Sequence, residues 1–345
     1  MITYSIIQKS HLEGAKRIDA EYFEQKYLEA EKTLNSIPTK TINDISERVV
    51  NFGAYSLCNF IVWRDKGIPY LNVQNIKEGF IDFTDVKFID EKVNEILNKS
   101  KVKEGDLILT MAGTIGNVAV AHKLKSPVNS NQATAKITLK KGFSPYFLSA
   151  FFNCYYGKSQ IIREIVSSVQ PNIFLWQIKN FKIPIVPEEI QKEIENIYLD
   201  SLNELENSKS LYSQAEGLLL EELGLKDFKF KDDLFFIVDS SKAKDRIDAD
   251  YFQPKYEQLI EKLKLFKANK LKDYISDYST GFTFKSENYQ EEGIPLIRIN
   301  NIKKGLIDLS DTAYLSEKDF SLSPKDEAKA GDIVLSMSGS VGLTA

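Results

Sequence analysis

Gly67–Phe83, which reads GIPYLNVQNIKEGFIDF, returns later in the chain as GIPLIRINNIKKGLIDL at Gly293–Leu309. The two copies share 9 of 17 residues at an offset of 226 residues. Each copy places β-branched and aromatic residues around Gly and Asn, which is typical of short strands joined by tight turns. The offset is far longer than the period of a solenoid repeat, so the similarity indicates duplication of a whole domain.

Two further segments repeat in the same order, one before and one after this stretch. RIDAEYFEQKY at Arg17–Tyr27 returns as RIDADYFQPKY at Arg246–Tyr256, with 8 of 11 residues identical. GDLILTMAGTIGN at Gly105–Asn117 returns as GDIVLSMSGSVGL at Gly331–Leu343, with 6 of 13 residues identical. Order, spacing and identity together exclude a chance similarity.

The 345 residues are 43% hydrophobic and 27% charged, as in an ordinary soluble globular protein of about two domains. No apolar run is long enough for a membrane span, and residues 1–30 are too charged for a secretory leader. Cys58 and Cys154 cannot form a disulfide scaffold, and with His11 and His122 they cannot complete a Cys₄ or Cys₂His₂ metal site. The composition therefore predicts a cytoplasmic protein without a metal site.

Charge is distributed unevenly, although the formal net charge is only −4. Lys99–Pro187 holds twelve Lys and Arg residues against three Asp and Glu, whereas residues 188–225 hold ten acidic residues against two basic ones. A cationic domain beside an acidic helix suits a protein that contacts phosphates with one part and another protein with the other. The alternative is that the charges segregate by accident of folding.

Hydrophobic periodicity predicts one helix, then short strands, then further helices in a repeat. Asp19 can cap a helix over Ala20–Ser36, and the strands that follow are separated by Gly, Asn and Asp turns. A helix over Pro145–Val166 and a strand over Lys182–Val186 close the first repeat. We expect an α+β fold with a mainly antiparallel sheet.

The longest predicted helix runs from Glu188 to about Leu223, after Pro187 and before Gly224. Apolar residues recur along it every seven residues, as in a coiled coil. This seam must be buried, either against its own domain or, as we expect, against the equivalent helix of a second repeat. The residues predicted to make this partner contact are Ile194, Tyr198, Leu202, Leu205, Tyr212 and Leu219.

The sequence contains none of the common catalytic signatures. There is no phosphate-binding Gly-x-x-x-x-Gly-Lys loop, no Gly-x-Gly-x-x-Gly loop, no Asn/Asp-Pro-Pro-aromatic motif and no nucleophile elbow beside a histidine. We therefore predict no catalytic residue and no cofactor in this chain. Two alternatives stay open: an enzyme that uses carboxylates between the repeats, and a scaffold or interaction module that binds peptides or sugars instead of DNA.

Polar loop residues of both repeats suit contacts with base edges. Asn and Gln can pair with adenine, Arg with guanine, and Ser or Thr with either, while turn or capping chemistry is the alternative for each residue. The second repeat changes several of them, as two readers of different sequences would: Arg298 stands where the first repeat has Asn72. With Lys77 as a phosphate contact, the candidate DNA-binding residues are Asn72, Gln74, Asn75, Lys77, Thr110, Thr114, Asn129, Asn131, Gln132, Gln170, Asn172, Arg298, Asn300, Asn301, Ser338 and Ser340.

Several longer stretches resemble the specificity subunits of type I restriction–modification systems. The order GIPYLNVQNI, KEGDLILTMAGTIGN, NSNQATAKI and SSVQPNIFLWQIKNFKIPIVPEEIQKEI is similar to a target-recognition domain of that family. The Ile-Pro strand that leads into a Glu- and Gln-rich helix at Ile183–Ile194 is typical of the family's domain-to-spacer junction. The resemblance implies two homologous target-recognition domains, at residues 1–187 and 226–345, separated by a coiled-coil-like spacer helix at residues 188–225.

The resemblance also implies a non-catalytic subunit that binds double-stranded DNA, with each recognition domain reading one half of a bipartite target. Its partners would be methyltransferase subunits, usually two, which hold the S-adenosylmethionine, together with restriction subunits. Some type II systems share this architecture. The second repeat reaches Ala345, equivalent to Ala119 of the first, and so lacks its last part. We expect either a truncation, or a homodimer or complementing fragment that supplies the remainder.

Overall fold

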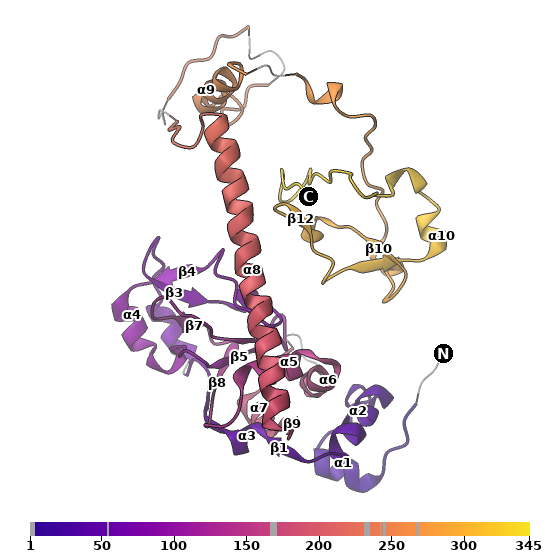
Figure 1. Cartoon of the computed structure of the whole chain (residues 1–345). Helices are drawn as coiled ribbons and strands as arrows, with labels where there is room; N and C mark the ends of the chain where they lie inside the picture. The colour runs from indigo at the N-terminus through magenta and orange to yellow at the C-terminus, as the bar shows by residue number, and fades with distance from the viewer. Residues whose placement is uncertain are drawn as a thin grey trace. The chain divides into compact units, whose positions relative to one another are not determined.

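The computed structural model describes residues 4–53, 55–165, 171–230, 235–241, 243, 246–266 and 269–345. These residues form two compact units, Met1–Leu219 and Leu220–Ala345, and the division falls within helix α8 (Glu188–Glu222). The units combine helices with small, mostly antiparallel sheets (Figure 1). The predicted α+β class is therefore confirmed.

A four-stranded antiparallel sheet forms the centre of the first unit. Alternate residues of a strand face opposite sides, so Leu107 and Leu109 pack on one side of this sheet and Ile108 on the other. Both sides are buried, which explains the continuous apolar run around these residues. The strand order is β2 (Ser46–Val50), β8 (Thr134–Leu139), β5 (Leu107–Thr110), β6 (Val118–Val120).

Three short helices cover the side that carries Leu107 and Leu109. They are α5 (Pro145–Asn153), α6 (Tyr155–Arg163) and α7 (Leu175–Asn180). The single helix predicted over Pro145–Val166 is wrong, because Cys154 adopts an extended conformation and separates α5 from α6. The two helices approach so closely that a Cβ at Gly157 would lie 2.1 Å from the Phe151 carbonyl oxygen, so glycine is required there.

A second sheet covers the opposite side of the central sheet. Its strands are β4 (Lys87–Ile89), β3 (Ile68–Leu71) and β7 (Asn129–Ser130), and β3 pairs antiparallel with β4 but parallel with β7. Ile108 packs here against Leu71, Ile76 and Val128. The connections contain η2 (Tyr55–Phe60), η3 (Val73–Asn75), α4 (Glu91–Ile96) and η4 (Asn98–Ser100). The first unit thus has three layers: helices, central sheet and second sheet.

An N-terminal arm precedes these layers. It contains α1 (Lys9–Ala15), η1 (Glu21–Phe23) and α2 (Gln25–Asn35), so the helix predicted over Ala20–Ser36 is interrupted at Glu24, whose ψ is 141°. The arm leads into β1 (Thr39–Thr41) and α3 (Ile42–Ile45). β1 pairs with β9 (Lys182–Pro184), which directly precedes α8. This pairing joins the start of the domain to the base of the long helix.

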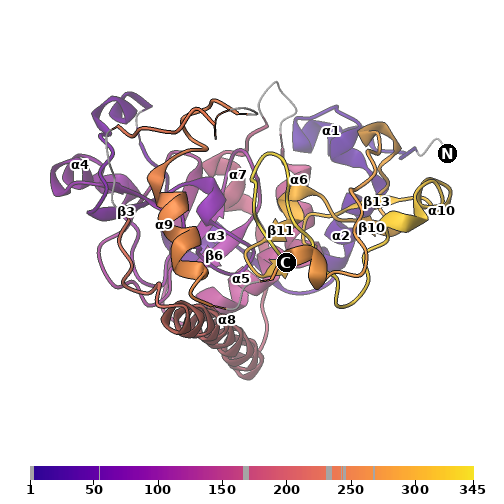
Figure 2. The ribbon, with the colours of Figure 1, turned by 90° about the horizontal axis from the view of Figure 1, so that it is seen from above.

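Helix α8 is continuous over 35 residues, or about 52 Å at a rise of about 1.5 Å per residue. The predicted long helix is therefore confirmed, and Figure 2 shows it end on. Gly224, at φ 61°, follows it in the left-handed conformation that ends many helices. None of its residues is fully buried, and no helix in the described part of the chain is long and apolar enough to cross a membrane.

The second unit repeats the hairpins of the first. β10 pairs with β13 as β3 pairs with β4, and Gly67 and Gly293 precede the equivalent strands at φ 144° and 138°. A Cβ at either glycine would lie 2.4 Å from a carbonyl oxygen. The unit contains α9 (Pro254–Leu263), η5 (Leu271–Asp273), η6 (Ser286–Asn288), β10 (Ile294–Leu296), η7 (Ile299–Asn301), β11 (Ile302–Lys303), β12 (Leu306–Ile307), β13 (Ala313–Leu315), α10 (Glu317–Phe320) and η8 (Pro324–Asp326).

The segment of the second unit that is equivalent to β5 forms no strand and is uncovered. Leu107 and Leu109 are fully buried, whereas the equivalent Ile333 and Leu335 are 81% and 52% exposed. In the first unit β8 pairs with β5 and α5, α6 and α7 cover it. No equivalents of these elements occur among the described residues of the second unit.

Lys136 of β8 is fully buried on the side of the central sheet that carries Ile108. Its ammonium donates hydrogen bonds to Ser130 Oγ at 2.9 Å and to the Thr134 carbonyl oxygen at 3.0 Å. Burial lowers the pKa of Lys136 to about 7, with Arg48 adding to the decrease and Asp106 opposing it.

We predict that Lys136 makes the fold more stable as the pH rises. Its folded-state pKa of about 7 lies below the ordinary lysine value of about 10.4, so between these values the unfolded chain binds more protons. The free energy of unfolding should increase by on the order of 3 kcal/mol from about pH 7 to about pH 10 through this group. Urea unfolding of the wild type and Lys136→Met at both pH values isolates the effect. The same pH dependence in both proteins would contradict it.

Candidate nucleic-acid interface

One buried amide holds the segment after β3 in shape. Asn75 Oδ1 accepts the Asn72 backbone N–H at 2.9 Å, and Asn75 Nδ2 donates to the Asp82 carbonyl oxygen at 3.0 Å. The Asp82 N–H returns to the Asn75 carbonyl oxygen at 2.7 Å. We call residues 72–84 the Asn75 hairpin. Asn75 is occupied inside the hairpin, whereas Asn72 is half-buried and Gln74 is exposed at its surface.

A second polar segment lies beside this hairpin. β3 and β7 are parallel neighbours, so the residues that follow them leave the sheet at the same edge. Asn131 Nδ2 lies 3.5 Å from Asn72 Oδ1, which places these two candidate side chains in contact. Gln132 is exposed next to Asn131, with its Oε1 3.9 Å from Cys58 Sγ.

Two further loops complete the same edge. Gly113, at φ 71°, would place a Cβ 3.7 Å from Val73 Cγ1, so the loop that carries exposed Thr114 lies against the Asn75 hairpin. Asn172 forms an isolated β-bridge with Ala112 of that loop. The structure thus gathers predicted residues from four loops on one surface, the polar edge: Asn72, Gln74, Thr114, Asn131, Gln132 and Asn172.

Four other candidates point inward and have structural contacts. Asn75 and Asn301 hold equivalent hairpins, and Thr110 Oγ1 accepts the Asn117 backbone N–H at 2.9 Å. Asn129 is completely buried, donates to Asn94 Oδ1 at 2.9 Å and accepts from Ser100 Oγ at 2.6 Å. Their burial argues against the predicted base contacts. Gln170 lies outside the described residues.

The second unit offers an equivalent but chemically different edge. Arg298 occupies the place of Asn72, and its guanidinium donates to the Asp311 carbonyl oxygen at 2.9 Å. Asn300 occupies the place of Gln74 and is exposed, donating to Asp311 Oδ2 at 3.2 Å. The predicted Ser338 and Ser340 are also exposed, on the loop equivalent to the one that carries Thr114.

Only part of the cationic excess is available to a ligand. Lys123 contacts α8, with Nζ 3.1 Å from Asn203 Oδ1 and 3.9 Å from Glu206. Lys158 and Arg163 form ion pairs with carboxylates at 2.6 and 2.7 Å. The predicted Lys77 is half-buried. The polar edge is therefore richer in amides and hydroxyls than in positive charge.

The seam of α8 divides into two parts. Ile194 and Tyr198 pack against the core of their own domain, which supports the alternative of burial on the domain over the expected pairing with another helix. Leu202 and Leu205 are half-buried. The C-terminal part is open: Tyr212 is 43% exposed, and the predicted Leu219 and the unpredicted Leu211 and Leu218 are exposed as well.

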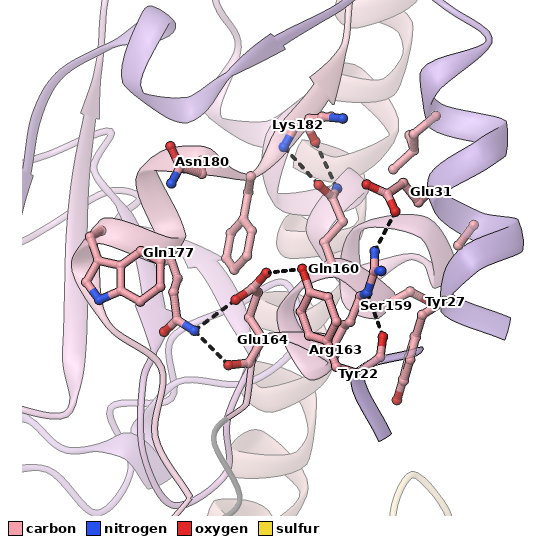
Figure 3. Close-up of a pocket in the computed structure, with 14 residues that line it drawn as sticks. Tyr22, Tyr27, Glu31, Ser159, Gln160, Arg163, Glu164, Gln177, Asn180 and Lys182 are labelled. Atoms are coloured by element: carbon pink, nitrogen blue, oxygen red, sulfur yellow. Dashed lines mark hydrogen bonds and ion pairs between the residues drawn. The ribbon is translucent and has the colours of Figure 1, made fainter. Parts of the chain in front are cut away.

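A cavity of about 120 Å³ lies between the N-terminal arm and helices α6 and α7 (Figure 3). Arg163 donates to the Tyr22 carbonyl oxygen at 2.8 Å and pairs with Glu31 at 2.7 Å, while Tyr22 Oη donates to Glu164 at 3.2 Å. Gln177 Nε2 completes the network, 2.9 Å from the Glu164 carboxylate. These polar groups form hydrogen bonds with one another. The contacts around the cavity therefore anchor the repeated arm motif to the domain.

Two exposed aromatic residues that were not predicted from the sequence follow Asn172. Phe174 and Trp176 expose 48% and 63% of their surface. Aromatic side chains can stack on bases or on a protein partner, whereas an apolar residue within a helical pattern is normally assigned to a core. The sequence pattern therefore does not distinguish these exposed aromatic residues from the buried Ile173 and Ile178 beside them.

We predict that Asn129 and Gln132, three residues apart, differ in their effect on stability. Asn129→Ala should lower the free energy of unfolding by about 2–3 kcal/mol, because it leaves buried Asn94 and Ser100 groups without their partner. Gln132→Ala is the matched surface control and should stay within about 0.5 kcal/mol of the wild type. Urea unfolding measures both, and similar losses would contradict the inward assignment of Asn129.

Comparisons with known proteins find matches over more than half of this chain. A family model described as a type I restriction modification DNA specificity domain matches residues 37–213. The chain is 23% identical over 274 residues to the type I restriction enzyme MjaVIII specificity subunit of Methanocaldococcus jannaschii, covering 78% of this chain and 56% of that protein. It is 20% identical over 310 residues to the EcoKI specificity subunit of Escherichia coli, covering 86% and 60%.

The chain thus spans little more than half the length of these relatives. A solved structure of a type I restriction–modification S subunit from M. genitalium is 17% identical, covering 82% of this chain and 63% of that one, with a TM-score of 0.38. The family match by itself covers more than half of the sequence. The chain therefore belongs to the type I restriction–modification DNA specificity domain family.

Proposed function

We propose that this chain is a non-catalytic subunit that reads DNA sequence, with each repeat reading one half of a bipartite target. One observation carries the proposal. The two repeats build the same hairpin with the same hydrogen bonds, Asn75 and Asn301 each accepting a backbone N–H at 2.9 Å, yet differ in the polar side chains they present. A shared scaffold with altered donors and acceptors is what two readers of different half-sites require.

The chemistry of the exposed positions supports direct readout of base edges. Gln74 in the first repeat and Asn300 in the second are primary amides, which can pair bidentately with adenine in the major groove. Arg298 replaces Asn72 and can pair with guanine once it leaves the Asp311 carbonyl oxygen. The second half-site should therefore differ from the first at the bases next to these residues.

Methyltransferase subunits, usually two, are the proposed partners, and they would supply the S-adenosylmethionine, with restriction subunits joining them in the cytoplasm. The acidic α8 with its exposed leucines offers the surface for a protein partner. This assembly rests on membership of the family and on the exposed part of α8.

We predict that Gln74→Ala and Asn300→Ala relax different halves of the target. Each change removes one amide, so discrimination at one base position should fall by about 1–3 kcal/mol while the other half-site stays intact. Sequencing of methylated bases, in cells that express the chain with its methyltransferase subunit, gives the motif for each variant. The two variants are matched controls for each other.

An unchanged motif in both variants would contradict readout by these amides. A loss of methylation that affects both half-sites equally would indicate a general role in binding or folding instead. A wild-type chain with no salt-dependent affinity for duplex DNA, alone or with its methyltransferase subunit, would favour the scaffold alternative.

A further inference from the structure

Tyr198 of α8 joins three separate elements of the first unit. Its hydroxyl donates to the Gly79 carbonyl oxygen in the Asn75 hairpin and lies 2.8 Å from Ser149 Oγ of α5. Ser149 and the Gly79 N–H both donate to the Val118 carbonyl oxygen of β6, each at 3.0 Å. The hairpin, the central sheet and α5 therefore meet the long helix at this phenol.

A second contact between the hairpin and α8 lies eleven residues further along the helix. Lys209 Nζ is 3.5 Å from Asp82 Oδ1 and 5.8 Å from the centre of the Phe80 ring. Three helical turns, about 16 Å, separate Lys209 from Tyr198. Two contacts at this separation restrict tilting of the hairpin on the helix more than either contact would alone.

Other bonds extend the same interface on both sides. Ser144 at the start of α5 donates to Glu195 at 2.5 Å, and Lys123 contacts Asn203 at 3.1 Å. The first part of α8 is therefore fixed to the domain over roughly 27 Å, from Gln191 to Lys209. Beyond Lys209 most residues of the helix are exposed.

We propose that Tyr198 and Lys209 are positioning residues that hold the first recognition unit at a fixed place and angle on α8, and that this grip sets the number of unread base pairs between the two half-sites. The inference rests on the proposed function. One base pair more or less moves a half-site by about 3.4 Å along the duplex and about 34–36° around it. A reader that tilts on its helix by a comparable amount no longer selects a single gap.

The grip itself can be measured without DNA. Spin labels are placed at Lys92→Cys on α4 and Gln214→Cys on α8, both exposed, in a chain whose two cysteines are changed to serine. In the double variant Tyr198→Phe, Lys209→Met we expect the label-to-label distance distribution to broaden about twofold. Lys192→Met, an exposed lysine that pairs only with Glu188 within α8 in the described structure, is the control and should leave it unchanged. An unchanged width in the double variant overturns the grip.

The gap is then read from methylated-base sequencing of cells that express each variant with the methyltransferase subunit. The wild type and Lys192→Met should show one gap length, and the double variant should add gaps one base pair shorter or longer with the same half-sites. A broader distance distribution with a single unchanged gap overturns the link between grip and gap. A wild-type chain that directs no two-part motif overturns the proposed function, while the distance measurement still decides the grip. Should the double variant lose its fold, Lys209→Met alone carries both measurements, because it removes only the contacts of an exposed side chain with Asp82 and the Phe80 ring.

Discussion

The buried amide of Asn75, and of Asn301 in the second repeat, is the interaction on which the candidate interface depends. Each amide uses both its oxygen and its nitrogen on backbone groups, at 2.9–3.0 Å, and closes a hairpin around itself. A buried polar group is tolerated only when it is satisfied in this way. The consequence is a turn whose backbone is held by the amide itself, so the side chains at neighbouring positions can change between repeats without changing the backbone.

The same logic explains which parts of the site were predictable from the sequence. The repeat established the correspondence between Asn75 and Asn301, and the polar run NSNQ suggested polar side chains on a loop. Asn129 was misplaced because β7 is only two residues long and pairs parallel with β3, a long-range contact that no local pattern reveals. The burial of Lys136 was not predictable for a related reason: a strand with one solvated face would expose this side chain, but the second sheet buries that face.

The predicted helix boundaries were wrong where a single residue departs from helical backbone angles. Cys154 and Glu24 are extended, and neither residue type signals a break. The long helix was predictable because its seam persists over five turns and more, but the seam does not tell what covers it. The structure divides the seam: Ile194 and Tyr198 serve the domain, whereas Leu218 and Leu219 remain exposed. One heptad pattern therefore includes residues that pack on the helix's own domain and residues that stay exposed.

If the chain has the proposed function, different residues provide the affinity for DNA and the discrimination between sequences. Affinity for duplex DNA depends mainly on cations that neutralise phosphates, whereas amides and hydroxyls at base edges provide discrimination. Lys136 is buried, and Lys123, Lys158 and Arg163 are engaged with Asn203, Glu206, Glu78 and Glu31 inside the first unit. The polar edge therefore has donors and acceptors to discriminate between bases but little charge to hold a duplex. On the proposed function, partner subunits would supply the phosphate contacts and thus most of the affinity for duplex DNA. A few amides of this chain would then provide the discrimination between base sequences.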